Sequence, residues 1–329
     1  MALQRGKQVE PKKAARRDRK QQGYDQSWYA LGQSEDFARG KVAGRDFLGG
    51  RVVVFRGEDG KPAALSAYCS HLGADLSVGC VMGGDLRCAF HHWQYGSDGI
   101  CTKIPASDKI PRRARVHSFP IAEKWGLVWA FNGPKPLFDV PEFRGFDESQ
   151  LTYKTAPAFD LPVEPWVPFT NSVDFQHLRV LHGLKVECDP RAVKIGDYSL
   201  EYDARLEDPK MGRFDQRIRV TGTNTIALTG DLNGMPVLSM ATGSPMEGGR
   251  TKGWSVTASP KIEGEDPMAV EQRLAMGEAF FKRLIEEDTP IMSSIRFREG
   301  VMLEADRTLS RFLKYVRKFP KAQPPPSYD

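Results

Sequence analysis

The chain has 329 residues, a length that suggests about two domains of roughly 150 residues each. Hydrophobic residues make up 40% and charged residues 27% of it, which is typical of a soluble globular protein and excludes a mainly disordered chain. The net charge is +5, but residues 1–22 alone hold eight basic and two acidic side chains. The remainder is therefore close to neutral. We predict a disordered basic tail over residues 1–25 and a folded body that does not bind nucleic acid.

The lengths of the apolar runs and the cysteine count bear on where the protein resides. Runs such as residues 127–131 are far shorter than the roughly 20 residues that span a bilayer. No apolar segment near the N-terminus resembles a secretory signal. Five cysteines are an odd number, which argues against a disulfide framework. We therefore expect a cytoplasmic protein without a membrane span.

The first half of the chain has the pattern of a small antiparallel β domain, which we place at residues 26–140. Short strand-like runs alternate there with glycine-rich turns. The strand candidates are residues 51–55, 64–68 and 126–131.

Two Cys/His pairs lie inside this β domain. Cys69 and His71 form one pair, Cys88 and His91 the other, with 16 residues between the pairs. Two thiolates and two imidazoles suit either a zinc ion or a [2Fe–2S] cluster with cysteines on one iron and histidines on the other. Because each loop mixes the two ligand types, unlike the usual zinc-finger order, the pattern favours the cluster.

The residues around these pairs resemble the two ligand loops of a Rieske domain. The first loop reads Tyr-Cys-Ser-His-Leu-Gly from residue 68, and the second reads Cys-Ala-Phe-His-His-Trp from residue 88. The resemblance implies that Cys69, His71, Cys88 and His91 bind the [2Fe–2S] cluster. Two positions depart from it: Ala89 stands where the family usually has proline, and His92 where glycine is common.

The second half of the chain mixes helical and strand-like segments, and we assign it to a second domain at residues 141–320. Residues 133–165 are proline-rich and are expected to be a connection. Asp266 followed by Pro267 marks a helix start, with helical spacing continuing to Pro290. Other helices are expected at 171–181 and 309–319, strands at 199–206, 217–228, 236–240 and 252–258, and a disordered tail at 321–329.

The helical segment at 171–181 leads into a second possible metal site. Asp174 precedes His177 by three residues, and His182 follows His177 by five. Residues five apart on an ideal helix point about 140° apart, so both imidazoles can meet one metal only if the helix bulges or ends between them. Gly183 is consistent with such an end. Two histidines and a carboxylate form the facial triad of non-haem Fe(II) oxygenases.

Together with the cysteine loops, this segment resembles the mononuclear-iron motif of Rieske non-haem iron oxygenases. The resemblance implies an α+β fold, with an N-terminal all-β Rieske domain and a C-terminal catalytic domain whose antiparallel sheet is covered by helices (helix-grip type). It implies that His177 and His182 bind iron with a third ligand from a C-terminal helix. We assign that ligand to Asp288, with Glu287 and Asp306 as alternatives.

The resemblance also implies how electrons and partners are arranged. Asp174 would carry electrons between subunits, from a neighbour's His91 to His177, in a homo-oligomer that we expect to be a trimer. Asn171 is a weaker candidate near the iron. Because the chain lacks a Gly-x-Gly-x-x-Gly dinucleotide fingerprint, NAD(P)H would act only through a separate flavin reductase, with or without a ferredoxin, while O2 is the co-substrate.

The substrate is the least determined part of this interpretation. Residues 96–105 and 288–291 resemble the ketosteroid-hydroxylase and sterol-desaturase branch, which favours hydroxylation of a bulky, mostly apolar, steroid-like substrate. Aromatic-ring hydroxylation or oxidative O/N-demethylation is the enzymatic alternative. A Rieske electron carrier and a zinc-stabilised binding protein are the alternatives without oxygenase activity. The pocket is expected to draw on residues 199–258, with Phe169, Phe175, Met240 and Trp254 as candidates.

Overall fold

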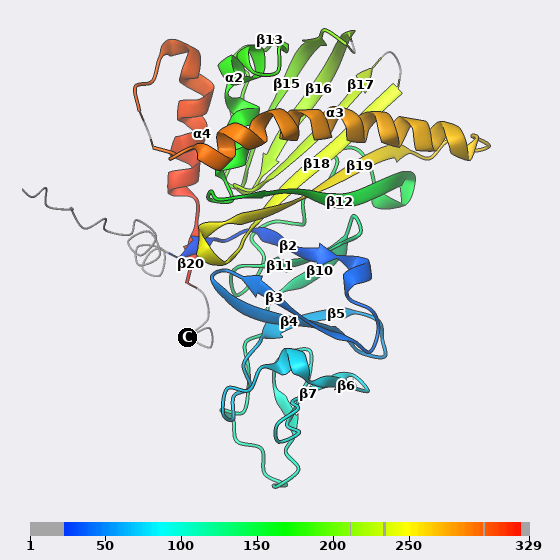
Figure 1. The fold of residues 1–329 in the computed structure, drawn as a ribbon, viewed down its shortest axis with the longest axis vertical. Helices are drawn as coiled ribbons and strands as arrows, with labels where there is room; N and C mark the ends of the chain where they lie inside the picture. Colours follow the sequence, from blue (N-terminus) through cyan, green and yellow to red (C-terminus); the bar gives the residue numbers. More distant parts are fainter. Residues whose placement is uncertain (1–22, 211, 233–234, 299, 324–329) are drawn as a thin grey trace, which may run out of the picture.

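The structure is a computed structural model and describes residues 23–323 except 211, 233, 234 and 299. It has an α+β architecture, with small β-sheets in the N-terminal half and one large antiparallel sheet with helices in the C-terminal half (Figure 1). This confirms the predicted fold class. In the part of the chain that the structure describes, no helix is long and apolar enough to cross a membrane. The basic tail over residues 1–22 and the last six residues of the C-terminal tail lie outside the described residues.

Three small antiparallel sheets form the N-terminal half. Strands β4 and β11 lie where the sequence predicts strands, and β5 begins two residues earlier than predicted. The strands are β2 (Trp28–Gln33), β10 (Ile121–Lys124) and β11 (Leu127–Phe131) in one sheet; β3 (Val42–Phe47), β4 (Gly50–Arg56) and β5 (Pro62–Ser66) in the second; and β6 (Cys80–Met82), β7 (Asp85–Arg87), β8 (Gln94–Tyr95) and β9 (Cys101–Lys103) in the third. Short 3-10 turns occur at η1 (Ser34–Asp36) and η2 (Leu76–Val78).

The C-terminal half is built on an eight-stranded antiparallel sheet in the order β12-β19-β18-β17-β16-β15-β13, with β14 also paired to β15. Its strands are β12 (Leu151–Leu161), β13 (Lys185–Glu187), β14 (Lys194–Ile195), β15 (Ser199–Asp208), β16 (Gly212–Thr221), β17 (Thr225–Leu232), β18 (Met235–Pro245) and β19 (Thr251–Pro260). Its helices are α2 (Phe175–Val180), α3 (Pro267–Ser294) and α4 (Arg307–Lys318), with 3-10 turns η3 (Glu148–Gln150), η4 (Val167–Val173), η5 (Glu247–Gly249) and η6 (Glu304–Asp306). The predicted run 217–228 is two strands, because Gly222, with a φ of 62°, opens a turn between β16 and β17.

Two expectations for this half are wrong. Residues 133–165 are not only a connection, because they contain the 11-residue strand β12. Its proline, Pro157, is tolerated because β12 is an edge strand and the pairing register shifts between Pro157 and Phe159. Helix α3 does not stop at Pro290 but continues to Ser294. In the turn where the proline lacks an N–H, the hydroxyl of Thr289 donates to the Ile285 carbonyl at 2.6 Å.

The large sheet is the central layer of the molecule. One of its faces packs against β2 and β11 through a shared core that includes Trp28, Trp129, Met240 and Trp254. Its other face packs against α3 and α4 through a second core. Helix α3 crosses the sheet in front of its strands, while β2 and β11 lie beneath it in the view of Figure 1. Apolar burial on the face that contacts β2 and β11 joins the two halves of the chain.

The buried side chain of Asn224 adds polar contacts between the halves. It accepts a hydrogen bond from Ser27 Oγ at 2.6 Å, and its Nδ2 donates to the carbonyls of Trp28 and Gly243 at 2.9 Å each. These bonds satisfy buried groups that would otherwise lack partners.

The two ends of the described chain meet. Strand β1 (Tyr24–Asp25) pairs with β20 (Lys321–Ala322), and Lys321 forms an ion pair with Asp25 at 2.5 Å. Both strands fall inside the segments predicted to be disordered tails, so that expectation is wrong at these residues. A short pairing of this kind between distant segments leaves no period in the sequence by which to find it.

Candidate metal centres

The two cysteine loops have the same turn geometry. The Cys69 N–H donates to the Ala74 carbonyl at 2.9 Å, and the Cys88 N–H donates to the Trp93 carbonyl at 2.8 Å, so each loop closes over the same span. The fourth residue after each cysteine has a left-handed backbone: Gly73 has a φ of 72° and His92 a φ of 59°. The departure at His92 therefore falls where the backbone itself favours glycine.

The loops bury their thiols and expose their imidazoles. Cys69 and Cys88 are buried, whereas His71 and His91 are exposed. The rings of the two histidines lie 4.7 Å apart, and His71 stacks on Trp93 at 4.6 Å. This arrangement fits a [2Fe–2S] cluster held by thiolates on its inner side and by imidazoles on its outer side.

Tyr95 supports the inner side of this site. Its hydroxyl lies 3.0 Å from Cys69 Sγ and 3.0 Å from Ser70 Oγ. Burial raises the pKa of the Cys69 thiol, and the hydrogen bond with Tyr95 opposes that rise. Bound iron would displace the thiol proton, and the Tyr95 hydroxyl would remain to stabilise the negative sulfur.

The second candidate site depends on where a short helix ends. The 3-10 turn η4 stops at Val173, and Asp174 caps α2 by accepting the N–H of His177 at 2.9 Å. Helix α2 ends at Val180, before His182, and Gly183 has a φ of 68°. Of the two possibilities that the spacing left open, a bulge or an end between the histidines, the structure has the end, which lets both imidazoles turn toward the same point.

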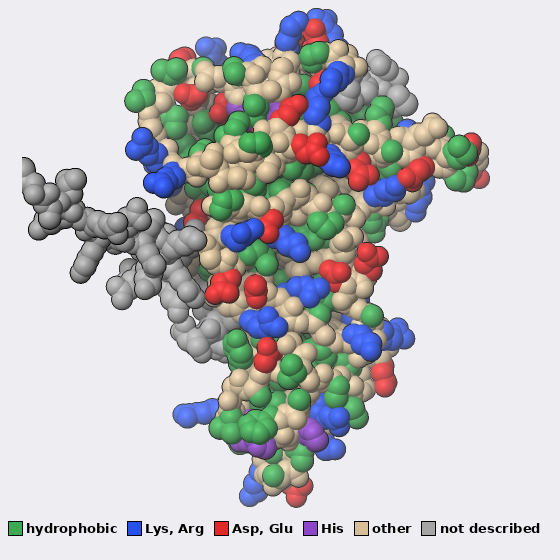
Figure 2. All heavy atoms as spheres, viewed as in Figure 1, with side chains coloured by type: hydrophobic (Ala, Val, Ile, Leu, Met, Phe, Trp, Pro, Cys, Tyr) green, Lys and Arg blue, Asp and Glu red, His purple; other side chains and the backbone are tan. Residues whose placement is uncertain are grey.

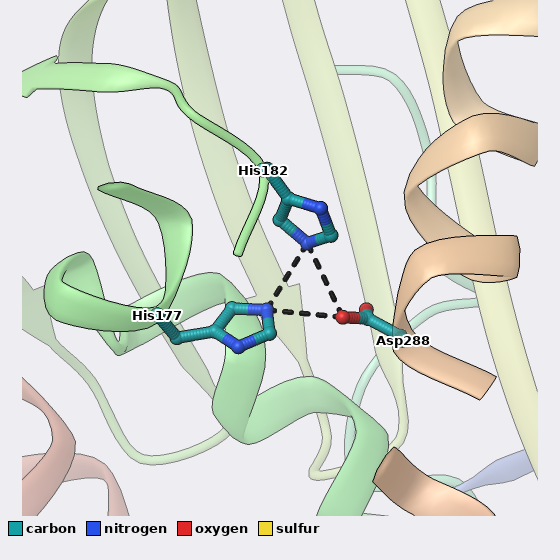
Figure 3. Close-up of side chains that lie close together, drawn as sticks. All are labelled: His177, His182 and Asp288. Atoms are coloured by element: carbon teal, nitrogen blue, oxygen red, sulfur yellow. Dashed lines mark hydrogen bonds and ion pairs between the residues drawn. The ribbon is translucent and has the colours of Figure 1, made fainter. Parts of the chain in front are cut away.

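Helix α3 brings Asp288 to that point, and three ligand atoms converge (Figure 3). His177 Nε2 lies 3.1 Å from His182 Nε2 and 3.1 Å from Asp288 Oδ1, and His182 Nε2 lies 3.2 Å from the same Oδ1. Atoms with this spacing match the corners of one octahedral face around a metal with bonds of roughly 2.1 Å. Two histidines and one carboxylate on one face are the donor set of a non-haem Fe(II) site.

The electrostatics of Asp288 also fit a cation. The atom Oδ1 is buried and makes no hydrogen bond of good geometry within the described chain, a cost that a metal would remove. Burial disfavours the charged form of Asp288, but His177 and His182 outweigh it and hold the pKa of this carboxyl at about 2. For His182, burial lowers the pKa, yet Asp288 and Glu287 raise it above its ordinary value. The site therefore concentrates negative charge on ionised oxygens beside two imidazoles.

The alternative third ligands have other positions. Glu287 lies behind His182, with Oε2 2.6 Å from Nδ1, on the opposite side of the ring from Asp288. Such a carboxylate fixes the orientation and tautomer of a metal-binding imidazole. Asp306 accepts the Leu303 N–H at 2.8 Å at the start of α4 and is not among the converging groups. The sequence could not separate Glu287 from Asp288, because adjacent helical residues differ only in the direction they face.

Asn171 and an adjoining cavity complete the site. Asn171 adds a smaller contribution to the low pKa of Asp288, although its buried Nδ2 is not aligned for a hydrogen bond. The adjoining cavity has a volume of about 130 Å³ and reaches both His182 and Asp288. Phe169 lines it as predicted, but Phe175 is not among its lining residues, and Met240 and Trp254 lie in the core shared with β2 and β11. The walls are mainly apolar side chains of β15, β16, β17 and α3, including Leu206, Phe214, Ile218, Leu228, Phe280, Phe281, Ile285 and Met292.

The two candidate centres lie at opposite ends of the molecule. In Figure 2, histidine side chains show in the lower part, with the cysteine loops, and in the upper part, behind α3. The surface around the cysteine loops exposes large apolar side chains, among them Leu72 at 67% and Phe90 at 61% exposure.

Comparison with known proteins places the first centre in a family. The family model described as the Rieske [2Fe-2S] domain matches residues 27–120. A probable 3-ketosteroid-9-alpha-monooxygenase oxygenase component from Rhodococcus rhodochrous is 41% identical over 112 residues, which are 34% of this chain and 28% of that protein. Cholesterol 7-desaturase nvd from Bombyx mori is 31% identical over 173 residues, 50% of this chain and 37% of that protein. Aminopyrrolnitrin oxygenase PrnD from Pseudomonas fluorescens is 31% identical over 169 residues, 49% of this chain and 46% of that protein. The matches span less than half the length of each of these relatives.

Solved structures extend the likeness to nearly the whole chain. Pseudomonas putida CBB5 NdmB has a TM-score of 0.71 at 23% identity, covering 88% of this chain and 89% of that one. Dicamba monooxygenase bound to dicamba has a TM-score of 0.69 at 22% identity, covering 90% and 98%. At this identity the structural likeness establishes the fold.

These findings define a protein with a Rieske [2Fe–2S] domain followed by an α+β domain built on a large antiparallel sheet. The chain thus contains a Rieske [2Fe–2S] domain and is similar in sequence to an oxygenase component and a desaturase, and in fold to a monooxygenase.

Proposed function

We propose that this chain is the terminal oxygenase of a multicomponent system. It would use O2 and electrons from a separate NAD(P)H-dependent reductase, directly or through a ferredoxin, to hydroxylate a mostly apolar organic substrate. The observation that carries this proposal is the convergence of His177, His182 and Asp288 beside an apolar cavity, in a chain that also has a Rieske domain. We divide the chain into the two functional domains between β11 and β12, at about residue 140.

The residues have separate tasks in this proposal. Cys69, His71, Cys88 and His91 would hold the cluster, and His177, His182 and Asp288 would hold iron. When bound, the cluster supplies single electrons and the iron supplies activation of O2. Glu287 keeps the His182 ring turned toward Asp288, because its carboxylate accepts from Nδ1. The apolar walls exclude water and orient the substrate next to the iron ligands.

Electron transfer in this proposal crosses between subunits. The cysteine loops and the His177 site lie at opposite ends of one chain (Figure 2), so a direct route inside the chain is disfavoured. Asp174 is the proposed link between His177 and His91 of the partner subunit. Its Oδ1 already fixes the start of α2 by accepting from the His177 N–H. A closed ring of such head-to-tail contacts is a cyclic oligomer, for which we propose a trimer.

Two observations bear on the substrate and favour different sizes. Relatives named as acting on ketosteroids and cholesterol support a bulky, steroid-like substrate. The cavity volume of about 130 Å³ is close to that of an engineered 150 Å³ cavity that binds benzene. The volume thus favours the alternative, in which a smaller aromatic compound is hydroxylated or demethylated.

The proposal is tested first by metal content. Protein purified without oxygen should contain about three irons and two acid-labile sulfides per chain. The Asp288→Asn variant should contain about two irons and two sulfides, and Glu286→Gln, a change at an exposed residue of the same helix, should match the wild type. Equal iron in all three proteins would exclude Asp288 as a ligand.

Turnover is tested next, with a surrogate reductase and a panel containing both steroids and single-ring aromatic ethers. O2 consumption coupled to a hydroxylated or demethylated product would support the proposal and choose between the two substrate sizes. Asp174→Asn should keep both metal centres and lose coupled turnover. Full turnover in that variant would exclude the electron-bridging role.

A further inference from the structure

Gln216 lies on the wall of the apolar cavity. Side chains alternate along β16, so Phe214, Gln216 and Ile218 point to the same face of the sheet. Phe214, Gln216 and Ile218 all line the cavity. Gln216 is only 4% exposed to solvent. An amide is therefore placed in the middle of an apolar wall.

The amide oxygen of Gln216 lacks a hydrogen-bond partner among the described residues. This atom, Oε1, is also buried. Opposite it on β17 stands Gly230, where a Cβ would lie only 2.6 Å from the amide carbon and nitrogen of Gln216. Because Gly230 has no side chain, the Gln216 amide fits beside it. The described residues give the amide oxygen no hydrogen-bond donor, which lowers the stability of the fold.

The other polar side chains of the cavity wall are already engaged. Ser172 and Thr289 donate from their hydroxyls to the carbonyls of Phe169 and Ile285, and the Tyr202 hydroxyl donates to the Ser172 carbonyl. Asn171, His182 and Asp288 belong to the candidate iron site. Within the described lining, Gln216 is the polar group left available to a ligand.

Gln216 is also separated from the proposed iron. The Phe214 ring packs edge-on against Phe280, with centroids 5.8 Å apart. Phe280 precedes Asp288 by eight residues on α3, which is about 12 Å along the helix axis. The cavity therefore has an iron end at Asp288 and a second end toward Phe214, next to Gln216.

We propose that Gln216 determines substrate specificity by hydrogen-bonding the single polar group of an otherwise apolar substrate. This rests on the proposed function of the cavity and refines it. The substrate class is an apolar ring system with one hydroxyl or amide-like group, held so that the opposite part of the molecule faces the iron ligands. A buried amide left unpaired by the wrong ligand disfavours analogues that lack the polar group.

Calorimetric binding of two probes of matched size tests this inference. Phenol can exchange a hydrogen bond with either atom of the amide, and toluene can exchange none. Binding is measured to the metal-loaded protein without reductase and without O2, so the result does not depend on turnover. The ratio of the toluene Kd to the phenol Kd should fall about tenfold in Gln216→Met relative to the wild type. The matched control is Ile218→Val, the next inward-facing position of β16, which should leave this ratio within twofold.

Thermal stability provides a second reading on the same variants. If Gln216 has no structural partner, Gln216→Met should have an unchanged or higher Tm, whereas a structural hydrogen bond would make the Tm fall. An unchanged ratio, a lower Tm, or no binding of either probe to the wild type would each overturn the inference. Loss of oxygenase activity on every substrate would instead count against the proposed function and leave the binding result standing.

Discussion

Gly73 and His92 occupy the same position in two loops of the same geometry. Each is the fourth residue after a cysteine, each precedes the residue whose carbonyl closes the turn, and their φ values are 72° and 59°. Only Gly73 suits that backbone without strain, because a left-handed conformation crowds a Cβ against the following carbonyl. The second loop therefore carries a strain that the first does not.

Replacing His92 by glycine should relieve this strain. A left-handed non-glycine residue destabilises the folded state by about 1–2 kcal/mol. Glycine removes this cost, but its greater conformational freedom in the unfolded chain offsets part of the stabilisation. We expect His92→Gly to raise the free energy of unfolding by about 0.5–1 kcal/mol, which is seen as a higher Tm of the cluster-loaded protein. Gly73→Ala should lower the Tm. A fall in Tm for His92→Gly would mean that the exposed imidazole makes a compensating contact.

Replacing Glu287 by glutamine should weaken metal binding without removing a ligand. The carboxylate accepts from His182 Nδ1 at 2.6 Å, and a neutral amide orients the ring less firmly. Loss of such a partner reduces metal affinity by roughly 10- to 100-fold. Titration of the metal-free second site with Fe(II) should show this loss in Glu287→Gln and none in Glu286→Gln. Equal affinities in the two variants would contradict a positioning role for Glu287.

Replacing Tyr95 by phenylalanine should lower the reduction potential of the cluster. In the wild type, the hydrogen bond between Tyr95 and Cys69 Sγ stabilises the reduced cluster, because that state carries more negative charge. The variant lacks this bond. A bond worth about 1 kcal/mol corresponds to roughly 45 mV for one electron. A spectroscopic redox titration should show a shift of this order for Tyr95→Phe and none for Tyr68→Phe, whose side chain is exposed. A potential that stays constant in both would show that the Tyr95 hydroxyl does not act on the cluster.

Removing the Asn224 side chain should loosen the contact between the two halves. Asn224→Ala leaves Ser27 Oγ and the carbonyls of Trp28 and Gly243 without their partner. We expect a loss of about 2–4 kcal/mol in the free energy of unfolding by denaturant. Ser244→Ala removes a single bond to the Ala30 carbonyl and should cost about 1 kcal/mol. Similar losses for both variants would mean that water replaces the missing amide.

The cysteine loops and the two histidines of the second centre could be predicted because they form short local patterns, whereas Asp288 is distant in the sequence and was assigned only from the family resemblance. Cys69 and His71 lie in one turn, and the spacing of His177 and His182 requires the helix end that the structure has after Val180. Long-range features were harder to predict. Strand β12 was missed because Pro157 is read as a break, although an edge strand accepts it. Gln216 was missed because alternation along a strand shows which face a side chain takes, but not whether its amide finds a partner.

The pairing of β1 with β20 has a consequence for the order of the chain. Because Tyr24–Asp25 lie beside Lys321–Ala322, a short linker could join the two ends of the described fold. New ends could then be opened in the exposed loop before α3, at Glu263 and Gly264. Circular permutation is tolerated at such exposed loops. The permuted protein would begin with the helix that carries Asp288, so this residue would be synthesised before the cysteine loops and before His177 and His182, instead of after them.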